Sequence, residues 1–240
     1  MRIEILKTTQ EIATRVSEVL LQQVRQKPDS VLGFATGSSP IETYQKLIEA
    51  KKKGTVDFSR VTTFNLDEYC GLEPTDPHSY YAFMREQLFA PAGFCYENVH
   101  FLSGLAEDHE AICRAYREEI ARCGGIDIQL LGIGRNGHIG FNEPSDSFSD
   151  GPFMVQLAQS TLDANARFFE NGTPPRYALT MGVGDILAAK KILLIATGDS
   201  KAQAIRAMVR GDVTPQCPAS ALQNHPDTTV YLDRAAAQLL

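Results

Sequence analysis

The chain has 240 residues, and 23 Lys and Arg against 29 Asp and Glu give a formal net charge of −6 at pH 7. A hydrophobic fraction of 43% and a charged fraction of 22% are ordinary for a globular protein, and the length suits one large α/β domain. The sequence has no Lys- and Arg-rich tract and no apolar run near the roughly 18 residues of a membrane span, so neither nucleic acid nor a membrane is an expected partner.

The N-terminal segment and the cysteines bear on the cellular compartment. Glu4 and Glu11 stand among the apolar residues of this segment, a pattern that fits neither a signal peptide nor an acid-free transit sequence. The cysteines are odd in number and have no C-x-x-C spacing: Cys70, Cys95, Cys113, Cys123 and Cys217. This pattern argues against a disulfide framework and against a zinc site. We therefore predict reduced thiols and a cytoplasmic location.

Short apolar runs alternate with segments of helical period along the whole chain. This alternation predicts a single α/β domain (1–240) with a mostly parallel open sheet and helices on both faces. Strands are expected at 2–6, 31–35, 61–66, 99–101, 127–132, 191–197 and 228–232. A first helix is expected between Thr8 or Thr9 and Pro28, and further helices are expected to begin at Pro40, Ser79, Ala106 and Ser200. The segment 144–175 is rich in Ser, Asp, Gly and Pro with weak periodicity, so we predict that it forms a lid.

Ligands of open α/β sheets bind where strands end, so the loops that follow the predicted strands are the informative segments. The first is VLGFATGSSP, in which a buried strand leads into Thr36, Gly37, Ser38 and Ser39. A Gly/Ser turn before a helix presents N–H groups and hydroxyls to an anion, which predicts a phosphate site. The alternative is that Ser38 or Ser39 only caps the helix.

The second segment, TTFNLDEYCGL, places the adjacent carboxylates Asp67 and Glu68 at the end of a strand. Successive side chains of a strand point in opposite directions, so one carboxylate could face the pocket while the other braces a loop or helix end. A carboxylate at the edge of an apolar sheet is a plausible general base. The alternative is a cap or a turn.

The third segment, DIQLLGIGRNGHIGFNEP, contains G-x-G-x-x-G after a strand. A dinucleotide-binding interpretation fails here, because Gly140 and Pro144 interrupt the long helix that this fingerprint should open. The loop instead carries His138 between Asn136 and Glu143. A nearby carboxylate orients an imidazole and raises its basicity, which suits proton transfer, although a structural histidine is the alternative.

The fourth segment, LLIATGDSKAQAI, places Lys201 in the first turn of a helix, where the helix dipole disfavours a cation unless an anion compensates. Arg167 in NARFFE stands beside Phe168 and Phe169 and could clamp a phosphate, or could simply pack on the aromatic rings. No motif suggests a metal. The remaining histidines show no ligand spacing and are expected to be structural or exposed: His78, His100, His109 and His225.

Six segments of this sequence occur together in one order: ATGSSP, FNLDEYCGL, GIGRNGHIGFNEP, NARFF, ALTMGVGDIL and GDSKA. In content and order they resemble the glucosamine-6-phosphate deaminase (isomerase) family along essentially the whole chain. The resemblance implies a sheet like that of ribose-phosphate isomerase and CoA transferases. It also implies an amino-sugar-phosphate isomerase/hydrolase activity, which converts glucosamine 6-phosphate to fructose 6-phosphate and ammonia without redox cofactor or required metal.

The resemblance also implies roles for the residues at matching positions. Asp67 resembles the base that moves a proton between C2 and C1, and His138 resembles the catalyst of ring opening, oriented by Glu143 and Asn136. The phosphate-binding positions are Thr36, Gly37, Ser38, Ser39, Arg167 and Lys201.

Two departures from the family pattern bear on the mechanism and its regulation. Some members carry Asp where this chain has Asn136, which leaves Glu143 as the main carboxylate partner of His138. The segment SDSFSDGPFMVQL holds no Arg, Lys or His, whereas allosteric hexameric members carry cations there that bind a phosphorylated activator. We therefore expect no activator site and a monomer or small homo-oligomer.

Two other functions are compatible with parts of the pattern. A 6-phosphogluconolactonase would share the phosphate loops but must activate water to hydrolyse a lactone. A non-catalytic sugar-phosphate-sensing module would keep the phosphate loops, lose the acid/base residues and carry a DNA-binding helix pair. The intact FNLDEYCGL and GHIGFNEP segments favour the deaminase.

Overall fold

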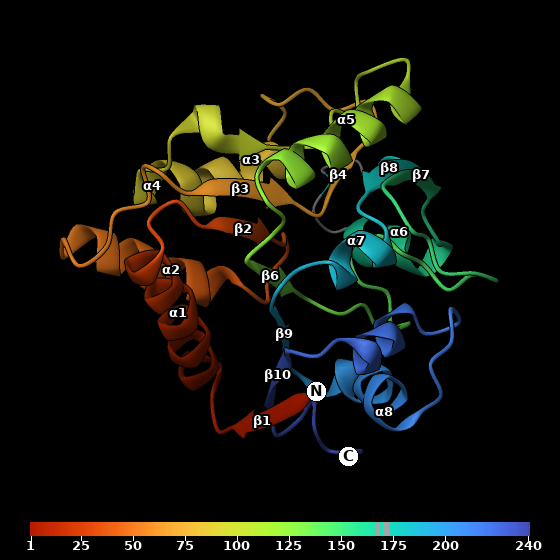
Figure 1. The fold of residues 1–240 in the computed structure, drawn as a ribbon. Coiled ribbons are helices and arrows are strands. Elements are labelled where there is room, and N and C mark those ends of the chain that lie inside the picture. The colour runs from red at the N-terminus through yellow and green to blue at the C-terminus, as the bar shows by residue number, and fades with distance from the viewer. Residues whose placement is uncertain (167–168, 170–172) are drawn as a thin grey trace.

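The computed structural model describes residues 1–166, 169 and 173–240. Its centre is a seven-stranded parallel sheet in the order β1-β10-β9-β6-β2-β3-β5 (Figure 1). These strands are β1 (Arg2–Leu6), β2 (Val31–Phe34), β3 (Thr62–Asn65), β5 (Val99–His100), β6 (Ile128–Leu131), β9 (Ile192–Ala196) and β10 (Thr228–Asp233). All seven expected strands are present at their predicted places, which confirms the mostly parallel sheet.

Helices cover both faces of this sheet. The helices that the structure describes are α1 (Thr9–Gln26), α2 (Ile41–Lys52), α3 (Tyr80–Met84), α4 (Ala90–Ala92), α5 (His109–Arg122), α6 (Gln159–Asn165), α7 (Val183–Leu187) and α8 (Ala202–Arg210). Of these, α6 packs through Leu162 on the cluster that includes Tyr69 and Ala178 rather than on the large sheet. Shorter turns are η1 (Arg85–Phe89, π-helical) and the 3-10 turns η2 (Tyr96–Asn98), η4 (Asp199–Lys201) and η5 (Pro218–Asn224). In the part of the chain that the structure describes, no helix is long and apolar enough to span a bilayer.

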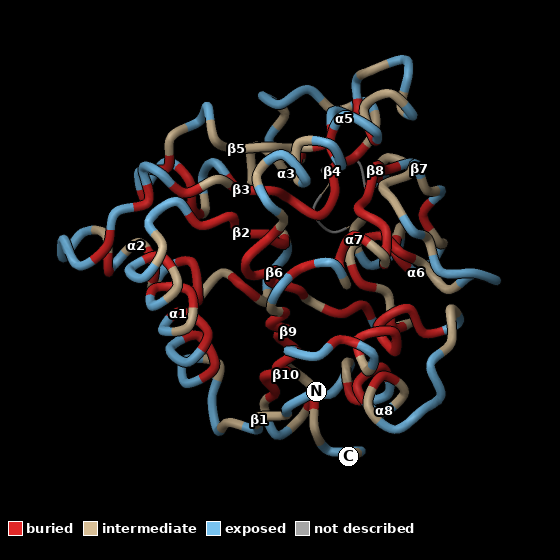
Figure 2. The backbone as a smooth tube through the Cα atoms, in the orientation of Figure 1, coloured by how far each residue is buried: buried red, intermediate tan, exposed pale blue. Residues whose placement is uncertain are grey.

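The alternation of strand side chains divides the core into two layers. Leu32 and Phe34 of β2 pack with Ile12, Val16 and Leu20 of α1 on one face of the sheet. The neighbouring side chains of β2 and β9 face α5, α7 and α8 on the other face, as Figure 1 shows for α7 and α8. Figure 2 shows the resulting buried strands at the centre of the molecule and the exposed outer faces of the helices.

Local capping explains where the helices begin. The Thr8 hydroxyl accepts a hydrogen bond from the backbone N–H of Glu11 at 3.1 Å, which confirms Thr8 as the cap of α1. The helix predicted to begin at Ser79 is α3, which Ser79 caps by accepting from the N–H of Ala82 at 3.0 Å. α5 begins at His109 rather than Ala106, because Asp108 accepts from the N–H of Ala111. α8 begins at Ala202 rather than Ser200, because residues 199–201 form a 3-10 turn.

A second, antiparallel sheet was not predicted from the sequence. It has the order β4-β8-β7, with β4 (Asp67–Tyr69), β8 (Tyr177–Thr180) and β7 (Phe153–Gln156). The segment 144–175 therefore contains a strand, β7, and a helix, α6, rather than only irregular chain. This small sheet fixes the position of Asp67, one of the candidate site residues, which pairs with Thr180.

Candidate active site

The order of strands in the large sheet locates the site. From β2 the chain proceeds outward through β3 to β5, and it returns to β6 on the other side of β2 before continuing to β9 and β10. The direction of strand addition thus reverses between β2 and β6. In open parallel sheets the crevice at such a switch point, outside the carboxyl ends of the strands, is where ligands bind. The four loops chosen from the sequence follow β2, β3, β6 and β9, which are adjacent in this sheet.

The loop after β2 has the form expected of an anion site. Gly37 adopts a φ of 91°, a conformation that favours glycine, and Ser38 is exposed. Pro40 takes the N-cap position of α2, so capping by Ser38 or Ser39 is not the explanation for these hydroxyls. The loop therefore leaves serine hydroxyls and a helix N-terminus at the switch point.

Lys201 lies at the start of α8 and reaches across to the neighbouring strand. Its ammonium donates a hydrogen bond to the carbonyl oxygen of Ile133, two residues beyond the end of β6, at 2.6 Å. This contact places a cation beside the loop that carries His138. Arg167, the other predicted cation of the site, lies outside the described residues.

Glycine is required in the loop after β6 because the His138 ring lies on the backbone of Gly134. A Cβ atom at position 134 would lie 2.4 Å from ring atoms of His138. The N–H of Gly134 donates to the carbonyl of His138, and the N–H of Gly137 donates to the carbonyl of Gly134. These turns replace the long helix of a dinucleotide fingerprint, in agreement with the rejection of that interpretation.

Glu143 is the carboxylate partner of His138. Nδ1 of His138 faces Oε2 of Glu143 at 3.4 Å, and the Asn136 amide donates to the same oxygen at 2.7 Å. Burial raises the pKa of Glu143, but the His138 ring and the hydrogen bonds from Thr161 and Asn136 outweigh it and hold the pKa below its ordinary value. The carboxyl is therefore ionised near neutral pH, where it can hold the ring in one orientation.

Asn136 connects this pair to the backbone. Its carbonyl oxygen accepts from the N–H of His138 at 3.2 Å while its amide donates to Glu143. An aspartate at this position could not donate to a carboxylate in its ionised form. The asparagine therefore acts as a neutral brace, and Glu143 supplies the negative charge beside the ring.

Asp67 is buried, with a side chain close to the turn between His138 and Glu143. A Cβ atom on Gly140 would lie 3.6 Å from Oδ2 of Asp67 and 2.9 Å from Oγ1 of Thr180. Burial, together with the charge of Glu68, raises the pKa of Asp67 to about 8. A carboxyl held this way is a strong base when it loses its proton, which is the property that proton abstraction from carbon requires.

Glu68 points the opposite way and braces the start of α3. Its Oε1 accepts from the N–H groups of Tyr69 and Tyr80, each at 2.9 Å, and its Oε2 accepts from that of Tyr81 at 2.8 Å. Burial raises its pKa, and these three donors oppose the rise. Glu68 therefore braces the start of a helix, as one of the two adjacent carboxylates was expected to do.

Replacing Glu68 with glutamine is expected to destabilise the fold. Both oxygens of Glu68 are acceptors, so the amide NH₂ of glutamine would face a backbone N–H and leave a buried donor without an acceptor. The expected loss is about 1–3 kcal/mol of unfolding free energy, measured by chemical denaturation at pH 7. Glu73→Gln, at an exposed position, is the control. Equal stability of the two variants would contradict the bracing role.

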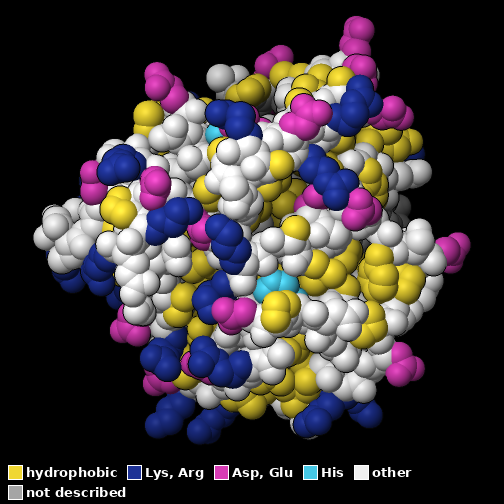
Figure 3. Space-filling view, in the orientation of Figure 1, with side chains coloured by type: hydrophobic (Ala, Val, Ile, Leu, Met, Phe, Trp, Pro, Cys, Tyr) yellow, Lys and Arg dark blue, Asp and Glu magenta, His cyan; other side chains and the backbone are white. Residues whose placement is uncertain are grey.

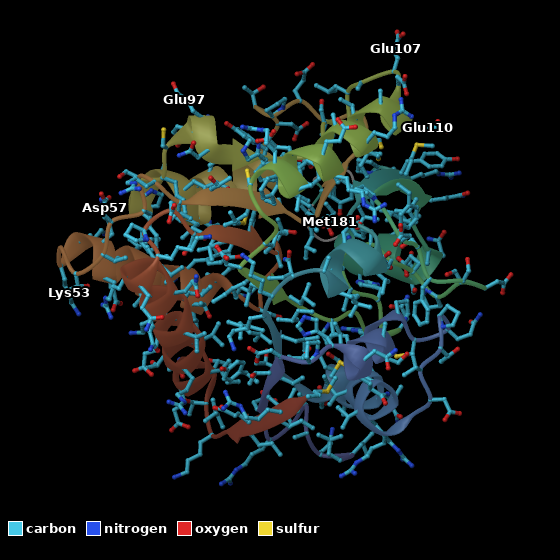
Figure 4. The ribbon with its side chains drawn as sticks, viewed as in Figure 1. Lys53, Asp57, Glu97, Glu107, Glu110 and Met181 are labelled. Atoms are coloured by element: carbon cyan, nitrogen blue, oxygen red, sulfur yellow. The ribbon has the colours of Figure 1, made fainter. Side chains whose placement is uncertain are left out.

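Sequence reasoning missed Asn142, which joins the two halves of the site. Its amide donates to the carbonyls of Ile139 and Met181, each at 2.8 Å, and its carbonyl oxygen accepts from Ser149. Met181 directly follows β8, the strand that pairs with Asp67, and Figure 4 labels it near the centre of the molecule. A single asparagine in a loop carries no signal in one sequence that would identify this role.

The other histidines have structural or peripheral places. His225 is buried and contacts the Thr228 hydroxyl and the Ala189 carbonyl, His78 pairs with Asp76, and His100 stacks on Phe64. Among the described residues, no cluster of three or more His, Cys, Asp or Glu side chains could hold a metal ion. On the face in Figure 3, Lys and Arg side chains lie interspersed with Asp and Glu.

Comparison with known proteins identifies relatives over the full chain. Residues 6–231 match the family model of glucosamine-6-phosphate isomerases/6-phosphogluconolactonase. The glucosamine-6-phosphate deaminase of Thermoanaerobacter pseudethanolicus is 48% identical, covering 100% of this chain and 95% of that protein. The corresponding protein of Shewanella loihica is 52% identical, with 100% and 90% covered.

Solved structures agree with this result. A monomeric glucosamine-6-phosphate deaminase superposes with a TM-score of 0.97 at 43% identity, covering 100% of both chains. The 6-phosphogluconolactonase of Trypanosoma brucei superposes with a TM-score of 0.77 at 17% identity, covering 100% of this chain and 98% of the other. The second likeness concerns the fold alone.

Proposed function

Since the chain belongs to the family of glucosamine-6-phosphate isomerases and 6-phosphogluconolactonases, we propose that it is an enzyme that converts glucosamine 6-phosphate to fructose 6-phosphate and ammonia. The observation that carries the proposal is the placement of a buried, weakly acidic Asp67 next to the turn that holds the His138–Glu143 pair. An aldose–ketose shift needs one base that returns the proton it takes, and ring opening needs a second group that moves protons between oxygens.

The substrate phosphate would bind to the loop after β2, through Gly37, Ser38, Ser39 and Thr36, and to Lys201. Arg167 is proposed as a further phosphate ligand on the strength of its motif. This placement uses the helix N-terminus of α2 and the ammonium group that contacts the loop after β6. The sugar then extends toward the loop after β6 and toward Asp67.

His138 would open the pyranose ring by taking the proton of the C1 hydroxyl and delivering one to the ring oxygen, with Glu143 and Asn136 holding its orientation. Asp67 would then remove the proton from C2 and return it to C1, through an enediol-type intermediate that carries the amino group. The resulting imine at C2 reacts with water, so that the C2–N bond breaks, ammonia leaves and a ketone remains. Desolvation at the buried Asp67 favours abstraction from carbon, because it raises the basicity of the carboxylate.

The lactonase alternative has weaker support. Lactonases are hydrolases, and their likeness to this chain is one of fold, at 17–19% identity for those of Trypanosoma brucei and Leishmania guyanensis. The relatives near 50% identity are deaminases. Description as an isomerase and deaminase of amino-sugar phosphates is therefore preferred to description as a hydrolase.

We further propose that residues 1–240 act as one domain, that 144–175 covers the bound substrate, and that the protein is a cytoplasmic monomer or small homo-oligomer. The structure of a monomeric deaminase at 43% identity supports the assembly proposal. The five free cysteines suit a reducing compartment.

Purified protein incubated with glucosamine 6-phosphate provides the test. We expect fructose 6-phosphate and ammonia in equal amounts, the first read by a coupled assay and the second by a separate one. Absence of ammonia together with hydrolysis of 6-phosphogluconolactone would overturn the proposal in favour of the lactonase.

The same assay tests regulation. Because the segment 145–157 holds no cation, we expect a hyperbolic rate curve that N-acetylglucosamine 6-phosphate does not alter. A sigmoidal curve that this compound makes hyperbolic would contradict the prediction.

A further inference from the structure

We propose that Thr161 is a positioning residue, whose hydroxyl couples the seating of helix α6 to the orientation of Glu143 and thereby of His138. The inference rests on the proposed function, since it concerns the carboxylate that orients the ring-opening histidine. Thr161 belongs to none of the sequence motifs, and it lies in a segment whose weak periodicity gave no indication of it.

The contact itself is specific. The Thr161 hydroxyl donates to Oε1 of Glu143, whereas Asn136 and His138 face Oε2 of the same carboxylate. Both partners are shielded from water, with Thr161 only 4% exposed and the side chain of Glu143 9% exposed. A hydrogen bond to a charged acceptor is strong where water cannot replace it, so this one fixes the rotation of the carboxylate.

A second contact sets the position of α6. Asn165 lies about one helical turn beyond Thr161, so both side chains point to one face of the helix. The Asn165 amide donates to the Tyr69 hydroxyl at 2.9 Å, and Tyr69 is in β4, the strand that carries Asp67. One face of α6 therefore contacts both β4, which carries Asp67, and Glu143, the partner of His138.

The hydrogen bond from Thr161 can be removed without changing the charged groups around Glu143. Glu143 also lines a cavity of about 430 Å³, together with serines, Asn142, Gln156 and apolar residues, and it is the titratable group among the described lining residues. The titratable group that faces Glu143 is the His138 ring. Loss of the Thr161 hydroxyl consequently removes one donor from the carboxylate without removing a charge.

Thr161→Val keeps the shape of the side chain and removes the hydroxyl, and Thr161→Ser restores it. We expect kcat of Thr161→Val to fall about tenfold, the effect of one hydrogen bond to a charged group. KM should change less, because Thr161 does not contact the phosphate loop. The midpoint of the Glu143 titration should move to higher pH, because losing a donor makes the carboxylate easier to protonate. Thr161→Ser should restore kcat and the Glu143 midpoint.

One control separates this role from a general effect of removing a hydroxyl from α6. Ser160→Ala removes an exposed hydroxyl from the same turn and should leave kcat and the Glu143 midpoint unchanged. If Thr161→Val retains the wild-type Glu143 midpoint and kcat, or if Thr161→Ser is as impaired as Thr161→Val, the proposal is wrong.

A measurement without turnover distinguishes failure of this proposal from failure of the proposed function. Carboxyl ¹³C NMR follows the titration of Glu143, assigned with a Glu143→Gln variant. The Glu143 midpoint should rise in Thr161→Val and return in Thr161→Ser, whatever substrate the enzyme uses. An unchanged midpoint would overturn the inference, whereas a wild-type protein that releases no ammonia would overturn the proposed function alone.

Discussion

Replacement of Asp67 by asparagine is expected to lower kcat by about a thousandfold or more, because the amide cannot take a proton from C2 and return it to C1. The phosphate loop is untouched, so substrate binding should be retained. Steady-state ammonia release and a separate binding measurement on the variant test this. Asp29→Asn, at an exposed position, is the matched control. Near-normal deamination by Asp67→Asn would show that another group is the carbon base.

The same substitution is expected to stabilise the fold. The pKa of Asp67 is about 8 in the folded protein and about 4 when unfolded, so between these values the folded state binds the proton more tightly. The contribution of Asp67 to the free energy of unfolding of the wild type is therefore fully present below about pH 4, and it is lost as the pH rises to about 8. The asparagine side chain of the variant carries no charge at any pH, so the Tm of Asp67→Asn should exceed that of the wild type increasingly toward pH 8. A constant difference across this range would contradict the burial argument.

Replacement of His138 by glutamine is expected to lower kcat about a hundredfold with little change in KM, since His138 moves protons and does not bind the phosphate. The defect should be smaller with a 4,5-dideoxy analogue of the substrate, which has no hydroxyl at C4 or C5 to close a furanose or pyranose ring. Parallel assays of wild type and variant on both substrates measure the difference. An equal loss on the two substrates would rule out ring opening as the role of His138.

The strands of the large sheet could be predicted because each is a short apolar run that must be buried on both faces. β4 could not be predicted in the same way, because Asp67 and Glu68 occupy two of its three positions and read as a loop. Its formation depends on pairing with β8, which is distant in the sequence. A single sequence contains no direct signal for such a pairing.

Part of the candidate site could also be predicted from the sequence, because some of its residues stand in recognisable motifs. Asp67, His138 and Glu143 stand in motifs at strand ends, where residue type and position together indicate a function. The raised pKa of Asp67 depends on burial, and the contact between Thr161 and Glu143 depends on how α6 is seated. Both are tertiary properties, which residue types alone do not determine.

Two glycines of the loop after β6, Gly132 and Gly134, differ in how much sequence change they can absorb. A methyl group on Gly132 would meet nothing within 4 Å, whereas one on Gly134 would lie 2.4 Å from the His138 ring. Because every other amino acid has a Cβ atom, each missense change of the Gly134 codon displaces the ring, however conservative it looks. We therefore expect alanine to be tolerated at position 132, and every substitution at position 134 to displace the histidine ring.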